Sequence, residues 1–60
     1  MTKKEKAAAA GFARVVFLEA QKYADKLDPK RRRANDASRA FDRMTEAANW
    51  AHWYLTGKHV

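Results

Sequence analysis

The stretch "KLDPK" (Lys26–Lys30) interrupts a chain that otherwise consists largely of good helix formers. Pro29 cannot continue a helix, because it lacks a backbone N–H and its ring clashes with the preceding turn, and it disfavours helical geometry at Asp28. The same pair begins a helix well, with Asp28 as N-cap and Pro29 in the first turn. We therefore predict two helices joined by one short turn.

Capping signals predict the outer ends of both helices. The run from Thr2 to Glu5 has the form of a capping box, and Gly57 is a natural residue to follow a helix end. The predicted helices cover about residues 3–27 and 29–56. Because the connection is short, we expect an all-α antiparallel two-helix hairpin that forms a single domain, residues 1–60.

Both segments carry apolar residues at the alternating spacing of three and four that is typical of a coiled-coil seam. The first set is Ala9, Ala13, Val16, Ala20, Tyr23 and Leu27, and the second is Ala34, Ala37, Phe41, Met44, Ala48, Ala51 and Leu55. Such alanine-rich seams bury little area, and a 60-residue chain without cysteine has no disulfide to compensate. We expect self-association into a four-helix bundle, or docking on a partner, to complete the core.

Large side chains also lie outside the predicted seam. At about 100° per residue, Phe17 and Leu18 fall off the seam of the first helix, and Trp50 and Trp53 fall almost opposite the seam of the second. Trp, Tyr and Arg dominate binding hot spots. The predicted partner-binding residues are Trp50, Trp53, Tyr54, Phe17, Leu18, Arg39 and Arg43. The alternative is that a second copy of the chain, or the N-terminal turn, covers these aromatic side chains.

Basic residues gather at the predicted start of the second helix. The chain has 13 Lys+Arg against 7 Asp+Glu, a net charge of +6 that favours acidic or polyanionic partners. Cations in the first turn of a helix oppose its dipole, so the cluster indicates contact with phosphate or an acidic surface, or else a solvated loop that maintains solubility. The candidate anion- or nucleic-acid-binding residues are Lys30, Arg31, Arg32, Arg33 and Arg14.

No pattern in the sequence indicates catalysis. Ser38 is the only serine, and His52 and His59 are seven residues apart, beyond the spacing of helical metal pairs. We expect no catalytic residues, no metal, no cofactor and no small-molecule substrate, and therefore not an enzyme. Arg14 and Glu19 interrupt the apolar stretch near the N-terminus, which argues against a secretion signal or membrane span, and the lack of cysteine fits a cytoplasmic protein.

The opening "MTKKEKAA" (Met1–Ala8) and the hairpin plan resemble the Rop (repressor of primer) family of helical-hairpin dimers. The resemblance implies an antiparallel four-helix dimer that binds paired RNA loops through polar residues and a phenylalanine of the first helix. Lys3 fits that scheme. Ala10, Arg14 and Leu18, which we place on the outer side of the first helix, depart from it.

Three functional hypotheses follow. The first is a small regulatory or inhibitory protein that docks on another protein through its Trp pair and the Arg-rich face of the second helix. The second is an RNA-binding dimer that uses Lys30–Arg33 on phosphates and the tryptophans on unpaired bases. In the third, the outer aromatics only cover the second subunit of a homodimer.

Overall fold

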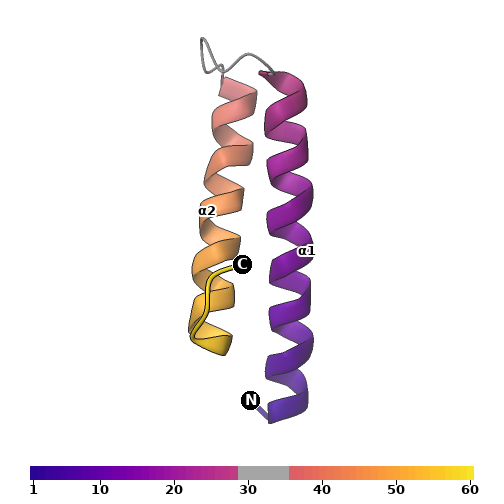
Figure 1. The fold of residues 1–60 in the computed structure, drawn as a ribbon, viewed down its shortest axis with the longest axis vertical. Coiled ribbons are helices and arrows are strands. Elements are labelled where there is room, and N and C mark those ends of the chain that lie inside the picture. The colour runs from indigo at the N-terminus through magenta and orange to yellow at the C-terminus, as the bar shows by residue number, and fades with distance from the viewer. Residues whose placement is uncertain (29–35) are drawn as a thin grey trace.

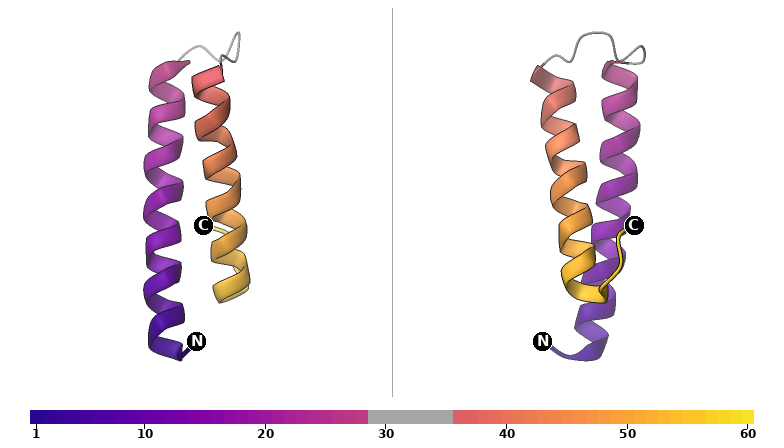
Figure 2. Two further views of the ribbon diagram at one scale, coloured as in Figure 1. Left: turned by 180° about the vertical axis from the view of Figure 1, so that it is seen from behind. Right: turned by 60° about the vertical axis from the view of Figure 1, so that its left-hand side comes forward.

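Two antiparallel helices make up the ordered architecture in the described residues, 1–28 and 36–60, of this computed structural model. Helix α1 covers Lys3–Leu27 and helix α2 covers Asp36–Thr56. They lie side by side along their lengths in every view, and the molecule measures 42 × 15 × 14 Å (Figures 1 and 2). The predicted all-α hairpin is confirmed. The predicted helix start at Pro29 and the seam residue Ala34 lie outside the described residues.

The N-terminal end of α1 is closed by the predicted capping box. The N–H of Glu5 donates to Thr2 Oγ1 at 3.1 Å, and the N–H of Thr2 donates to Glu5 Oε1 at 3.3 Å. These two bonds satisfy donors that have no partner within the helix. At the other end the N–H of Asp28 donates to the Ala24 carbonyl at 3.1 Å.

The end of α2 is set by Gly57. Its φ is +77°, and its N–H donates to the Trp53 carbonyl at 2.7 Å. This is the single-bond left-handed helix end, which glycine adopts without the steric cost of a Cβ atom. The predicted role of Gly57 is confirmed, and the turn reverses the direction of the chain.

Small side chains form the interface between the helices. On α1 the buried or half-buried residues recur at steps of three and four, and on α2 a corresponding row faces them. The α1 row is Ala10, Ala13, Phe17, Ala20 and Ala24, and the α2 row is Ser38, Phe41, Thr45, Ala48, His52 and Leu55. Ala24 and Ser38 have no exposed surface. Alanine and serine at these positions let the two backbones approach closely, but they bury little apolar area.

The observed interface keeps the predicted seam residues Ala13, Ala20, Phe41, Ala48 and Leu55, and it shifts the alternate positions of each seam by one residue. The predicted seam residues Tyr23 and Met44 are 45% and 46% exposed, whereas Ala24 and Ser38, outside the predicted seam, are fully buried. The predicted seam residues Leu27, Ala37 and Ala51 are exposed as well. Two helices that pack through their smallest residues approach closest, so the larger apolar side chains lie along the edge of the contact.

Two other expectations about α1 are wrong. Phe17 was predicted to lie off the seam, but it is half-buried on the face that contains Ala13 and Ala20. Ala10 was predicted to point outward, but it is 6% exposed. At every second position of the predicted seam, the inward residue of α1 is therefore the next one along the chain.

Candidate functional site

Three aromatic side chains gather on the last turns of α2. The Trp50 and Trp53 rings, three residues apart on one helical face, meet edge to face with centroids 5.7 Å apart and planes at 84°. Tyr54 packs against Trp53 at 5.3 Å and 76°. Exposed fractions are 49% for Trp50, 39% for Trp53 and 79% for Tyr54. Edge-to-face packing of this kind holds the rings in a fixed arrangement.

The residues after Gly57 turn back along the last turns of α2, as the yellow segment in Figure 1 shows. The His59 ring is stacked on Trp53 with centroids 6.2 Å apart and planes at 19°, and it meets the edge of Trp50 at 5.6 Å and 78°. The N–H of Val60 donates to Asn49 Oδ1 at 2.8 Å. We call Trp50, Trp53, Tyr54 and His59 the aromatic surface.

Polar contacts fix the returning segment to α2. His52 Nδ1 lies 2.6 Å from the Lys58 carbonyl oxygen, and because a carbonyl only accepts, Nδ1 carries the hydrogen. The Thr56 hydroxyl accepts from the N–H of Lys58 at 3.1 Å and donates to the His52 carbonyl at 2.9 Å. Beside these bonds lies a hollow of about 270 Å³, lined by Arg14, His52, Lys58, His59 and Val60.

The predicted partner-binding residues fall into two groups. Trp50, Trp53 and Tyr54 lie together, and Arg39 and Arg43 are exposed on the same helix. Arg39 and Arg43 are eleven and seven residues before Trp50, about three turns and two turns away on the same side of α2. The exposed run therefore extends from the aromatic surface along α2.

The remaining candidates are placed elsewhere or are not described. Phe17 lies in the hairpin interface, and Leu18 is 49% exposed on α1. Arg14 lines the hollow beside His59, about 20 Å along α1 from the end that leads to the turn. Lys30–Arg33 lie outside the described residues.

His59 is part of the aromatic surface but was not among the predicted site residues. In the sequence it was noted only for its spacing from His52, which is too long for a helical metal pair. The signal that was available is Gly57: a left-handed residue at a helix end reverses the chain, so a side chain two residues later returns toward the last turns. Those turns contain Trp50 and Trp53.

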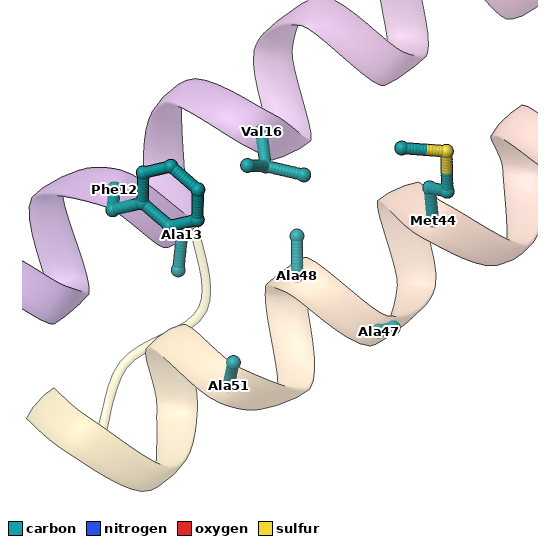
Figure 3. Close-up of a pocket in the computed structure, with 7 residues that line it drawn as sticks. All are labelled: Phe12, Ala13, Val16, Met44, Ala47, Ala48 and Ala51. Atoms are coloured by element: carbon teal, nitrogen blue, oxygen red, sulfur yellow. The ribbon is translucent and has the colours of Figure 1, made fainter.

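A second surface runs along one face of the hairpin, where two adjoining hollows of about 300 and 280 Å³ lie between the helices. The first hollow is lined by Phe12, Ala13, Val16, Met44, Ala47, Ala48 and Ala51 (Figure 3). The second is lined by Val15, Val16, Glu19, Ala20, Tyr23, Phe41 and Met44. We call this face the apolar groove. Glu19 is the one charged side chain among these lining residues.

The apolar groove and the aromatic surface lie on different sides of α2. Trp53 is nine residues after Met44, which corresponds to about half a turn of rotation around the helix axis. A molecule bound in the groove therefore leaves Trp53 accessible.

Comparison of the chain with protein-family models, with curated proteins and with solved structures gives no significant match. Within the described residues, neither helix is long and apolar enough to cross a membrane. The same part of the chain contains no group of three or more His, Cys, Asp or Glu side chains placed to hold a metal ion.

Proposed function

We propose that the protein is a small, non-enzymatic regulatory binding protein that docks on another protein through Trp50, Trp53 and Tyr54. Arg39 and Arg43 contribute from the same helix. The observation that supports this proposal best is the position of the two tryptophans, which lie half-exposed at the end of α2 instead of in the alanine core.

The arrangement is suited to binding with little ordering cost. A fully covered tryptophan or tyrosine buries about 150–250 Å². The rings of Trp50 and Trp53 already pack against each other and against His59, so less side-chain freedom is lost when a partner covers them. Such rigid aromatic anchors are what most binding hot spots contain.

The charges around the aromatic surface favour a protein partner over a nucleic acid. The outward side of α2 carries both signs, because Asp36 and Glu46 flank Arg39 and Arg43 along the helix. A surface that binds nucleic acid would be more uniformly basic. Charges of mixed sign set orientation on a protein surface that has complementary charges.

Affinity capture with matched variants tests the proposal. The tagged wild-type protein, a Trp50→Ala/Trp53→Ala variant and a Lys4→Ala/Lys22→Ala control would be compared in nuclease-treated extract. We expect specific proteins to be retained by the wild type and the control and lost with the tryptophan variant. Binding of the recovered protein would then be measured with purified components, after circular dichroism has shown that the variants keep their helicity.

The RNA alternative has a distinct outcome in the same experiment. If capture occurs only in untreated extract and is lost with Arg31→Ala/Arg32→Ala, the partner is a nucleic acid and the proposal is wrong.

A further inference from the structure

We propose that a second copy of this chain covers the apolar groove, in an antiparallel arrangement that forms a four-helix bundle with Val16 and Met44 near its two-fold axis. The exposed area of the hairpin supports this. A compact monomer of 6.9 kDa would expose about 4,000 Å². The hairpin exposes 4889 Å², about 900 Å² more, and a standard interface removes about 800 Å² from each partner.

The core of the single hairpin also indicates a missing layer. All the buried hydrophobic residues in the described part of the chain are alanines: Ala10, Ala13, Ala20, Ala24 and Ala48. The large apolar side chains that would normally make a core stand on the groove face instead, with Phe12 72% and Val15 58% exposed. Covering them with a second copy places them inside a four-helix core.

The groove has the shape of a surface that fits itself. The hollow nearer the chain ends has four alanines among its lining residues, and the hollow nearer the turn is walled by Tyr23 and Phe41, whose rings pack at 5.7 Å. Val16 and Met44 line both hollows and so lie between them. A two-fold axis at this level brings the bulky hollow of each copy onto the alanine-lined hollow of the other, as an isologous interface requires.

The residue spacing agrees with this register. Tyr23 and Ala9 are each seven residues from Val16 on opposite sides, so Tyr23 faces Ala9 of the second copy at about 1.5 Å rise per residue. On α2, Phe41 and Ala47 are each three residues from Met44, so Phe41 of one copy lies at the level of Ala47 of the other. Large and small side chains therefore share a level in both helix pairs.

A parallel arrangement would lose this complementarity. It would put Tyr23 and Phe41 of both copies in one layer and bring the two Glu19 carboxylates to the same level of a dry interface, where like charges are costly. The antiparallel arrangement separates both the bulky rings and the two carboxylates.

The mass in solution tests the dimer. Sedimentation equilibrium is expected to give twice the 6.9 kDa chain mass. Ala51→Glu places a charge in the groove and should dissociate the dimer, whereas Ala7→Glu, the same change on an exposed α1 position outside the groove lining, should not. A helical monomer at the concentrations used for the wild type would overturn the proposal, and so would a dimer insensitive to Ala51→Glu.

Cysteine cross-linking tests the arrangement without depending on how well the glutamate variant folds. The chain has no cysteine of its own, so single substitutions report single pairs. Two Met44→Cys chains are expected to form a disulfide with each other. A Tyr23→Cys chain is expected to form one with an Ala9→Cys chain. Each disulfide requires that the two Cα atoms lie within about 7 Å. If Met44→Cys chains instead cross-link preferentially with Val16→Cys chains, the copies are parallel and the proposed arrangement is wrong.

Both tests are independent of the partner suggested above. A monomer that still captures its partner through the tryptophans would contradict only the dimer proposal. A dimer that captures no protein would contradict only the proposed docking function.

Discussion

The imidazole of His59 is stacked on the indole of Trp53, with centroids 6.2 Å apart and planes 19° apart. This contact joins the segment after Gly57 to the most prominent aromatic side chains of the molecule. One face of Trp53 is therefore covered by the chain itself, and a partner that binds that face must first displace His59.

Removing the His59 ring should expose the tryptophans. In His59→Ala we expect emission at longer wavelength and faster quenching by acrylamide, because both indoles gain contact with water, while the far-ultraviolet circular dichroism stays unchanged. Lys58→Ala is the control, because Lys58 is held by hydrogen bonds of its backbone carbonyl and N–H, which alanine retains. Unchanged emission in His59→Ala would show that the ring does not rest on Trp53 in solution.

Alanine substitution of the two glycines should change the stability of the protein in opposite directions. Gly57→Ala places a Cβ on a residue with φ +77° and is expected to lower the free energy of unfolding by about 1–2 kcal/mol. Gly11→Ala adds a Cβ inside a helix where nothing lies within 4 Å, and it should stabilise by about 0.5–1 kcal/mol. Urea unfolding of both variants at one fixed protein concentration measures the difference. Equal effects would contradict the assigned backbone at Gly57.

The capping box should contribute measurably to stability. Thr2→Ala removes the acceptor for the Glu5 N–H and is expected to lower the free energy of unfolding by about 1 kcal/mol. Thr2→Ser keeps a hydroxyl in place and should be close to wild type in the same urea titration. If Thr2→Ser lowers the free energy of unfolding as much as Thr2→Ala does, the Thr2 hydroxyl is not what stabilises the start of α1.

Enlarging the closest contact between the helices should destabilise the hairpin. Ala24 has no exposed surface, so Ala24→Leu is expected to cost about 1–3 kcal/mol by overpacking. Lys22→Leu, two residues away and exposed, adds a leucine to the same turn without a steric penalty. Thermal unfolding at one protein concentration compares them, and a stable Ala24→Leu variant would mean that the helices lie farther apart at this level.

The hairpin itself was predictable because its signals are local. Thr2 with Glu5, and Gly57 alone, define the described helix ends through backbone chemistry that depends on few other residues. The direction of the interface was not predictable in the same way. Apolar residues occupy two adjacent stripes of each helix, and periodicity alone does not show which stripe faces the neighbouring helix. Here Ala24 and Ser38 face it, whereas Tyr23 and Met44 line the apolar groove.

The aromatic surface was predictable only in part. Helical spacing places Trp50 and Trp53 on the side of α2 away from the seam, and they are exposed. The cover supplied by His59 depends on where three residues outside any helix come to rest. That position follows from specific bonds at His52, Thr56 and Asn49, which no period in the sequence encodes.

The alanine-rich interior has a consequence for how unfolding of this protein would be observed. Both tryptophans lie at the surface, where they sense the returning C-terminal segment, while the helices alone determine the circular dichroism. Fluorescence therefore monitors detachment of that segment, and circular dichroism monitors loss of the helices. Two denaturation curves with separate midpoints would be the natural behaviour of a chain whose spectroscopic reporters lie outside its core.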